Sequence, residues 1–303
     1  MSDSSSPAAS IRAPEWFVNA VATPKESGVI DVANCPIHYQ CWGEKDRPGL
    51  MLVHGNGAHV GWWDFIAPFF IDRFRVAAFD LSGMGNSGHR PHYTSELYVE
   101  EIMAVCAVAR MKGLPILLGH SFGGRLVLKA ALLRGDDLAG IIMADSPFRA
   151  GKHRVDFAKR RAEGIKPKNL YPTYAAARER FRLNPAQPCD NKYIVDYIAK
   201  GSIQQTPEGW TWKFDPKLWS TFEYEKLFRD TLTDETKLWG FIYGEHSILF
   251  PEDVANYSCE LVQSLTGAEV IRIRDAHHHL FLDQPLAFVD AVNNVLDTHH
   301  SLD

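Results

Sequence analysis

The stretch "PILLGHSFGGRLVL", residues 115–128, places a serine between an apolar run and a second run with helical spacing. The first run predicts a buried strand and the second predicts a helix. Between them, Gly119, Ser121 and Gly123 form the pattern G-x-S-x-G. Glycines let the chain turn sharply from strand to helix, which lifts the serine above the edge of a sheet and beside a helix N-terminus that favours negative charge. This context predicts that Ser121 is a nucleophile rather than a simple helix cap.

Further apolar stretches have the length and residue types of strands. They are residues 49–55, 74–81, 140–146, 238–244 and 268–274. Most are near-continuous rather than alternating, as a parallel sheet covered on both faces requires. Residues 96–112 and 124–134 have helical spacing and provide crossovers between strands. The sequence therefore predicts the α/β class, with a doubly wound, mostly parallel sheet.

The pattern changes after Pro147. Up to about Asp230, the chain reads as short amphipathic helices with many charges and an aromatic cluster, "WTWKFDPKLW". We therefore expect a helical insert in an α/β core. The expected boundaries are a disordered N-terminus over 1–10, a core formed by 11–147 and 231–303, and the insert over 148–230.

The composition excludes several classes of partner. At 303 residues with 46% hydrophobic content, the chain can form one large domain or a core with an insert. Its 32 basic and 37 acidic residues give a net charge of −5, so neither nucleic acid nor anionic lipid is expected as a partner. The start, "MSDSSSPAAS", has no signal segment, and no apolar run approaches the roughly 18 residues of a membrane span. We expect a soluble cytoplasmic protein.

The five cysteines are scattered and lack C-x-x-C spacing. This pattern argues against a zinc site or a disulfide scaffold and fits a reducing compartment. We expect no cofactor and no metal, and a small hydrophobic molecule as the substrate. The sequence leaves open whether the protein is a monomer or a homodimer.

Several motifs together resemble the α/β-hydrolase superfamily, over nearly the whole chain from about Val32 to Val295. One is the Ser121 motif, and another is "HGNGAH" (54–59), which follows a strand as the family's oxyanion loop does. That loop supplies a backbone N–H near the nucleophile. The resemblance implies an oxyanion hole formed by the amides of Asn56 and Phe122, with Gly57 as the alternative to Asn56.

The stretch "DAHHHLFLDQP" (275–285) resembles the family's catalytic-histidine loop, in which the base lies seven residues before the proline that opens the last helix. Counting back from Pro285 selects His278, with His279 next to it facing the pocket or the cap. Adjacent histidines project in different directions and no carboxylate spacing supports them, so no metal is expected here. Asp283 is expected to cap the last helix.

The acid of the triad is not at its usual place. Most family members carry an aspartate in G-x-x-D after the penultimate strand, where this chain has Ser247. Some relatives, including certain haloalkane dehalogenases, place the acid at the end of the strand beside the one that carries the nucleophile. That position is Asp145. Adjacent strands lie about 4.8 Å apart, so we expect the side chain of Asp145 to face the same crevice as Ser121. We expect Asp145 to be the acid, with Glu245 as the alternative.

The insert lies where the family carries a cap domain, which sets substrate choice. We expect Trp62, Trp210, Trp212 and His279 to line the pocket, although aromatic residues of an insert also suit its own core. The resemblance implies a serine hydrolase that cleaves a medium-sized hydrophobic ester or lactone through an acyl-enzyme.

The alternatives are a carbon–carbon bond hydrolase of ring-cleavage diketones and a ligand receptor on the same fold. Relatives that cleave such diketones usually carry tryptophan after the catalytic histidine, where this chain has His279. Epoxide hydrolases and dehalogenases are disfavoured, because they carry aspartate in place of Ser121.

Overall fold

The computed structural model describes residues 12–149, 169–223 and 232–299. The N-terminal segment expected to be disordered lies outside these ranges. Parts of the predicted insert, residues 150–168 and 224–231, also lie outside them.

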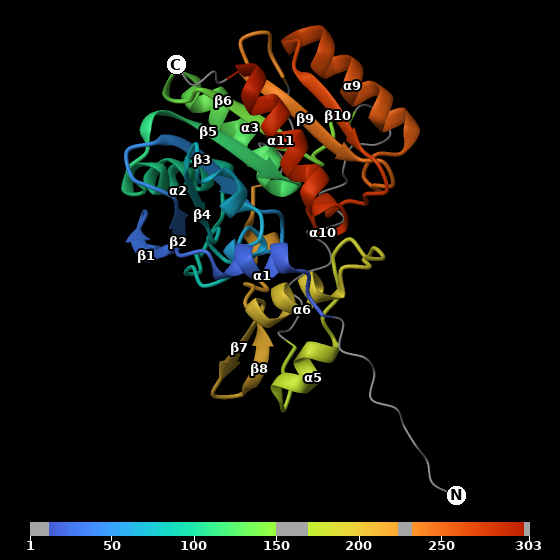
Figure 1. The fold of residues 1–303 in the computed structure, drawn as a ribbon. Coiled ribbons are helices and arrows are strands. Elements are labelled where there is room, and N and C mark those ends of the chain that lie inside the picture. Colours follow the sequence, from blue (N-terminus) through green and yellow to red (C-terminus); the bar gives the residue numbers. More distant parts are fainter. Residues whose placement is uncertain (1–11, 150–168, 224–231, 300–303) are drawn as a thin grey trace, which may run out of the picture.

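An eight-stranded sheet forms the centre of the molecule, with the strand order β1-β2-β4-β3-β5-β6-β9-β10 (Figure 1). The parallel strands are β3 (Pro48–Val53), β4 (Arg75–Phe79), β5 (Lys112–His120), β6 (Gly140–Ala144), β9 (Leu238–Gly244) and β10 (Glu269–Ile273). Each coincides with a stretch that the sequence predicts as a strand. The prediction of a mostly parallel, doubly wound sheet is therefore confirmed.

The sheet continues into an antiparallel edge that the sequence analysis missed. Here β1 (Glu26–Asp31) pairs with β2 (Pro36–Trp42), which in turn pairs antiparallel with β4. The side chains of β1 alternate between exposed and partly buried positions. An antiparallel edge can face water in this way, so it lacks the continuous apolar run that revealed the central strands.

Helices cover both faces of the sheet (Figure 1). Outside the insert they are α1 (Glu15–Ala22), α2 (Ser95–Val108), α3 (Phe122–Arg134), α9 (Glu252–Thr266), α10 (Leu280–Asp283) and α11 (Pro285–His299). The helix predicted over 96–112 ends earlier, at Val108. Arg110 has a φ of 57°, outside the helical range, and Lys112 already begins β5.

Neighbouring residues of β5 face two different hydrophobic cores. Leu117 packs with α2 and α3, whereas Leu118 packs with α11. Successive side chains of a strand point to opposite faces, so a strand buried on both faces needs apolar residues without alternation. This requirement explains the continuous apolar runs of the sequence.

The described part of the insert gathers at one end of the molecule (Figure 1). It contains the short helices α5 (Tyr174–Glu179), α6 (Lys192–Gly201) and α7 (Leu218–Thr221), and the hairpin β7 (Ile203–Thr206) and β8 (Gly209–Trp212). The helices match the predicted pattern, but the hairpin was not predicted. Ile194 and Ile198 of α6 join the hydrophobic core that also contains α11, so this helix packs onto the main body.

Within the described ranges, no helix combines the length and apolar character that a membrane span needs.

Candidate active site

Ser121 lies in a sharp turn between β5 and α3. Its φ of 57° and ψ of −115° are rarely adopted by a residue with a side chain, and such backbone strain is typical of functional sites. The Ser121 amide donates to the carbonyl of Ala144, 2.8 Å away. A Cβ on Gly119 would lie 2.3 Å from the carbonyl oxygen of Gly123, and one on Gly123 would lie 2.3 Å from that of Val53. Both glycines are therefore required for this turn.

A buried histidine and a buried carboxylate pair beside this turn. The Nδ1 atom of His278 lies 2.7 Å from Oδ1 of Asp145, and these residues are 3% and 0% exposed. A carboxylate oxygen accepts, so Nδ1 donates and the second ring nitrogen, Nε2, is left for another partner. His120 Nε2 donates to the carbonyl of His278 over 2.9 Å, which ties the histidine loop to the turn.

The carboxylate of Asp145 is held from the loop after β9. The Gly244 amide donates to Oδ2 over 2.8 Å, and the Ser247 hydroxyl donates to Oδ1 over 2.6 Å. Glu245 points elsewhere: it accepts from the Asp275 amide at 3.2 Å. The structure therefore brings Asp145, and not Glu245, to His278.

No hydrogen bond joins Ser121 to His278 among the residues that the structure describes. The ring of His278 nevertheless lies 4.9 Å, between centroids, from the ring of His120, the residue before the serine. In enzymes without bound substrate, catalytic hydrogen bonds are often long and tighten only in the complex. The arrangement is compatible with proton transfer once substrate is bound.

The loop over residues 54–59 lies next to the turn. In the described ranges, no acceptor takes a hydrogen bond from the amide of Asn56 or Phe122, the donors expected for an oxyanion hole. The Gly57 amide points to Sδ of Met84 at 3.4 Å, which is a weak acceptor. The Gly57 amide, the alternative to Asn56 as an oxyanion donor, is therefore directed to Met84. The amides of Asn56 and Phe122 have no acceptor among the described residues.

Residues 50–291 match the family described as "Alpha/beta hydrolase family". The chain belongs to the alpha/beta hydrolase family. Among curated relatives, it is 26% identical to the pimeloyl-(acyl-carrier protein) methyl ester esterase of Aeromonas hydrophila, over 82% of this chain and 94% of that protein. It is 25% identical to the (lyso)-N-acylphosphatidylethanolamine lipase of Bos taurus, over 84% and 80% of the two chains.

A 1-acylglycerol-3-phosphate O-acyltransferase of Arabidopsis thaliana is 27% identical over 82% of this chain, which spans only 66% of that longer protein. Among solved structures, the thioesterase domain of the curacin biosynthetic pathway has a TM-score of 0.71, with 19% identity over 89% of this chain and 100% of that domain. That likeness is evidence for the fold.

In this α/β-hydrolase, the expected pocket residues divide into two groups. The rings of Trp62 and His279 lie 5.2 Å apart, both side chains are buried, and His279 also contacts the rings of His120 and His278. The structure does not bring the other two tryptophans to this cluster. Trp210 packs against Tyr174, and Trp212 against Tyr171 and Phe181, all within the insert.

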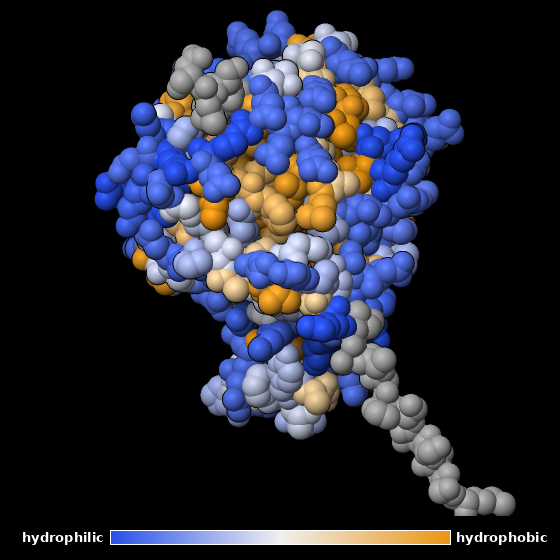
Figure 2. Space-filling model, viewed as in Figure 1, coloured by the Kyte–Doolittle hydropathy of each residue, from blue (hydrophilic) through white to orange (hydrophobic). Residues whose placement is uncertain are grey.

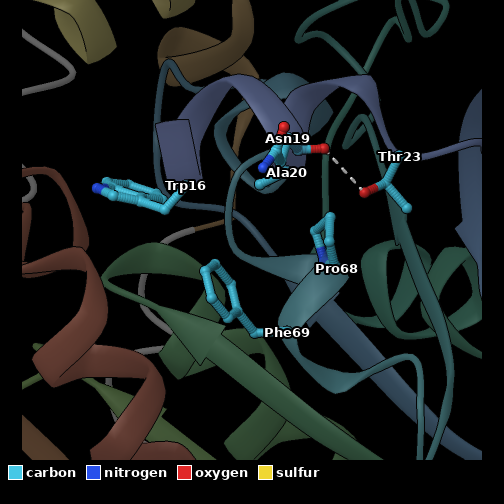
Figure 3. A pocket seen from close by; sticks show the side chains of 6 residues that line it. All are labelled: Trp16, Asn19, Ala20, Thr23, Pro68 and Phe69. Carbon is cyan, nitrogen blue, oxygen red and sulfur yellow. Dashed lines mark hydrogen bonds between the residues drawn. The ribbon is translucent and has the colours of Figure 1, made fainter. Parts of the chain in front are cut away.

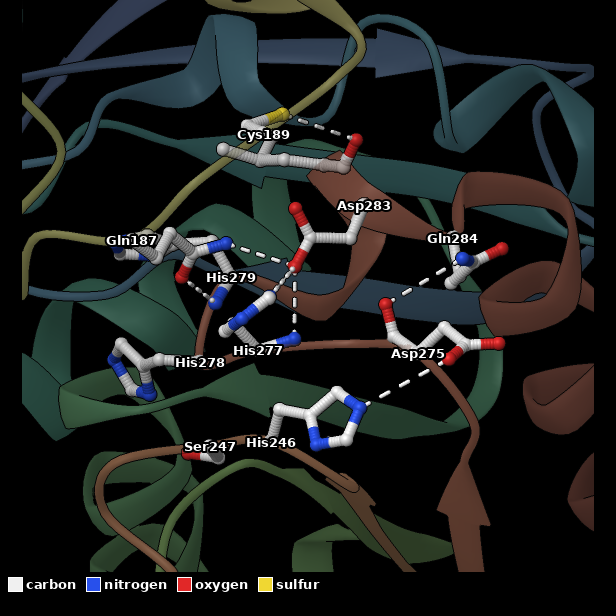
Figure 4. Close-up of polar contacts among 12 residues, drawn as sticks. Gln187, Cys189, His246, Ser247, Asp275, His277, His278, His279, Asp283 and Gln284 are labelled. Carbon is white, nitrogen blue, oxygen red and sulfur yellow. Dashed lines mark hydrogen bonds and ion pairs between the residues drawn. The ribbon is translucent and has the colours of Figure 1, made fainter.

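The insert contacts the histidine loop of the α/β-hydrolase through Gln187 (Figure 4). Its Oε1 accepts from the His279 amide at 2.8 Å, and its Nε2 donates to Asp283 at 2.9 Å. The same carboxylate oxygen of Asp283 accepts from the amide and Nδ1 of His277, at 2.8 and 3.0 Å. The expectation that Asp283 caps the last helix is therefore wrong, because its carboxylate fixes the loop that carries His278.

Buried histidines surround the site, and three of them had no role predicted from the sequence. His54 Nδ1 donates to the carbonyl of Gly55 and its Nε2 accepts from the Leu81 amide. His59 Nε2 donates to the carbonyl of Ile198 in α6, 2.9 Å away, so this ring links the loop over residues 54–59 to the insert. The third is His120. The sequence contained a signal for all three, since "HGNGAH" and "GHS" both place a histidine beside a glycine turn of the candidate site.

Burial keeps several of these rings neutral. It lowers the pKa of His120 and His279 well below the ordinary value, and the neighbouring His278 lowers both further. Burial also lowers the pKa of His54 to about 4, although the charge of Asp80 opposes part of this shift. The site therefore contains neutral imidazoles, whose ring nitrogens can act as acceptors.

Two hollows open on the surface away from Ser121. The first has a volume of about 260 Å³. It is lined by residues of α1, including Trp16, and by Pro68 and Phe69 of the short helix Ala67–Phe70 (Figure 3). The second, of about 390 Å³, lies between the core and the insert and includes His59 and Lys213. The view in Figure 2 shows a mainly polar face with a patch of apolar side chains. Neither hollow includes Ser121.

Proposed function

We propose that this protein is a serine hydrolase that cleaves a medium-sized hydrophobic carboxylic ester or lactone through an acyl-enzyme. The nucleophile is Ser121, the base is His278 and the acid is Asp145. The observation that carries the proposal is the 2.7 Å contact between Asp145 and His278 beside the strained turn at Ser121. That the enzyme acts on ester bonds agrees with its family and its esterase and lipase relatives.

The proposed reaction begins when Ser121 Oγ attacks the carbonyl carbon of the ester. His278 Nε2 takes the hydroxyl proton as the Oγ–C bond forms, and the amides of Asn56 and Phe122 stabilise the oxyanion. His278 then gives the proton to the leaving alcohol as the C–O bond breaks. Water, activated by the same ring, releases the acid from Ser121.

Asp145 acts in this scheme through His278. Its carboxylate keeps the proton on Nδ1, so that Nε2 presents a lone pair to the serine, and it stabilises the imidazolium that forms. The hydrogen bonds from Gly244 and Ser247 support this assignment, because they hold the carboxylate oxygens in place.

We further propose that residues 148–230 form the cap over a core made of 11–147 and 231–303. Contacts from the insert to the oxyanion loop, through His59, and to the histidine loop, through Gln187, support this division. The buried ring of Trp62 beside His279 supports a hydrophobic acyl group in the pocket. Five free thiols support a cytoplasmic location.

The test is hydrolysis of p-nitrophenyl esters of increasing acyl length by the wild type and by Ser121→Ala. We expect turnover with a preference for medium chains, and a loss of about 10⁶ in kcat without the serine. A serine-directed phosphonate should label Ser121 in the wild type. Wild-type turnover by Ser121→Ala, or cleavage of ring-fission diketones with negligible ester activity, would contradict the proposal.

A further inference from the structure

Three imidazoles from two distant parts of the sequence meet beside the turn. His120 precedes the serine, while His278 and His279 come from the histidine loop (Figure 4). One ring nitrogen of each lies within 4.8 Å of one ring nitrogen of the others. Ring centroids are 4.8 to 5.6 Å apart, and all three side chains are buried.

Several ring nitrogens of this cluster have no hydrogen-bond partner among the described residues. They are Nδ1 of His120 and both nitrogens of His279, although the backbone carbonyls of Asn184 and Pro185 face the His279 ring and favour a proton on it. Buried polar atoms without a partner are rare in folded proteins, and each one points to a water molecule, an ion or a functional role. The reaction proposed above uses His278 only. The remaining nitrogens are therefore available to a ligand.

The hydrogen bonds of the cluster determine where lone pairs are available. His120 donates through Nε2 to a carbonyl oxygen, which cannot donate, so the neutral ring carries its lone pair on Nδ1. His278 donates through Nδ1 to Asp145, which leaves its lone pair on Nε2. A histidine that binds a metal through one ring nitrogen usually donates the N–H of its other ring nitrogen to a carbonyl or a carboxylate. His120 and His278 both have this second contact.

We propose that His120, His278 and His279 bind a divalent transition metal of the zinc type, and that this metal inhibits the enzyme. Three imidazole ligands and an open fourth position suit Zn²⁺, whereas Mg²⁺ and Ca²⁺ prefer oxygen ligands. Zn–N bonds of about 2.0 Å require the ring nitrogens to move closer together than the 4.8 Å limit that this structure shows, so metal binding must shift these rings.

The inhibitory effect rests on the proposed function of His278. A metal on Nε2 occupies the atom that takes the proton from Ser121, so the base is blocked while the metal is bound. Metal binding itself does not depend on that role. A binding measurement therefore separates the two proposals.

The chain also provides a matched control at its surface. Glu245, His246 and Asp275 likewise place one ligand atom each within 4.8 Å of the others. These side chains are more exposed, with 52% and 81% exposure at His246 and Asp275. If zinc acted through this surface group, His246→Ala would lower the zinc sensitivity.

The experiment uses the full chain after treatment with a chelator. Zn²⁺ is titrated against hydrolysis of a p-nitrophenyl ester, and Co²⁺ binding is followed separately by visible absorption. We expect about one tightly bound Co²⁺ with the strong absorption of tetrahedral coordination, and loss of activity with stoichiometric Zn²⁺ that EDTA reverses.

Among the variants, His279→Phe keeps an aromatic ring beside Trp62 but removes both nitrogens. Relative to its own activity, its half-inhibitory zinc concentration should rise by at least about 10-fold, whereas His246→Ala should behave as the wild type. The absence of Co²⁺ absorption from the wild type would overturn the proposal even if His279→Phe fails to fold. So would a zinc response that His246→Ala removes.

Ser121→Ala distinguishes the failure of one proposal from the failure of the other. This variant should be inactive and still bind Co²⁺ as the wild type does. If the wild type binds Co²⁺ but hydrolyses no ester, the proposed function fails and the metal site stands. If the wild type hydrolyses esters and binds no Co²⁺, the metal site fails alone.

Discussion

Ser247 donates a 2.6 Å hydrogen bond to Oδ1 of Asp145, the oxygen that also accepts from His278. The serine stands where most α/β-hydrolases are expected to carry the acid. A hydroxyl cannot replace the charge of a carboxylate, but it can stabilise a carboxylate that reaches the histidine from the neighbouring strand. The loop after β9 thus still contributes to the candidate site through a hydrogen bond to Asp145.

Replacing Asp145 with asparagine should lower kcat by about 10⁴, because an amide can hold the imidazole in the wrong tautomer. The thermal midpoint and the kcat of p-nitrophenyl ester hydrolysis measure the fold and the reaction separately. Glu245→Gln is the matched control, since its carboxylate faces Asp275, and it should retain wild-type activity. Full activity in Asp145→Asn with an inactive Glu245→Gln would assign the acid to Glu245.

Ser247→Ala should have a much smaller effect. A hydrogen bond between a hydroxyl and a carboxylate contributes about 1 to 3 kcal/mol, so kcat should fall by roughly 5- to 150-fold. The double variant Asp145→Asn with Ser247→Asp moves the carboxylate to the usual family position. It should recover part of the rate lost in Asp145→Asn, measured under the same conditions. A double variant no faster than Asp145→Asn would show that a carboxylate at 247 does not serve His278.

Gln187 should act as a positioning residue for the histidine loop. Gln187→Leu removes the acceptor of the His279 amide and a donor to Asp283, and both atoms are part-buried. Small displacements of catalytic groups are costly, so we expect kcat to fall roughly 10-fold with a smaller change in KM. Steady-state kinetics over several esters measures this split.

Gln284→Leu provides the control for Gln187→Leu. Its side chain makes one exposed contact of 3.5 Å, to the carbonyl of Asp275 in the same loop. This variant should keep the wild-type kcat. Equal losses in both variants would indicate a general disturbance of the loop instead of a specific role for Gln187.

The tryptophans should separate into two classes. Trp212→Ala should lower the melting temperature and leave the preference for acyl length unchanged, because its ring packs within the insert. Trp62→Ala should change kcat/KM between short and long esters, because its ring contacts His279. Melting curves and the ester panel are measured on both variants. A changed preference for acyl length in Trp212→Ala would show that Trp212 contributes to the substrate pocket.

The sequence predicted those parts of the fold and site that depend on local patterns. Continuous apolar runs marked the central strands, and Asp145 could be proposed as the partner of His278 because it directly follows one of them. The antiparallel strands β1 and β2 were missed because their mixed residues have no such run. The contact between Gln187 and His279 joins residues 92 positions apart, and it depends on how the insert packs. Such a contact has no local signal.

The last prediction concerns the pH dependence of stability. His54 is buried as a neutral ring: its Nδ1 donates to the carbonyl of Gly55, and its Nε2 accepts from the Leu81 amide. A proton on Nε2 would break the second bond. Burial lowers the pKa of this ring in the folded protein to about 4, below the ordinary value of 6.5; the charge of Asp80 raises it and that of His59 lowers it.

In the unfolded chain His54 takes up its proton near pH 6.5, whereas in the folded chain it does so only near pH 4. The free energy of unfolding should therefore fall as the pH decreases through this window, with about 3 kcal/mol from this residue. His54→Gln keeps a donor and an acceptor but cannot titrate. Urea unfolding at pH 7, 6, 5 and 4.5 should show a shallower pH slope for this variant than for the wild type, even if its stability at pH 7 is lower. Equal slopes would mean that the stability loss at low pH comes from the other buried histidines, such as His120 and His279, and not from His54.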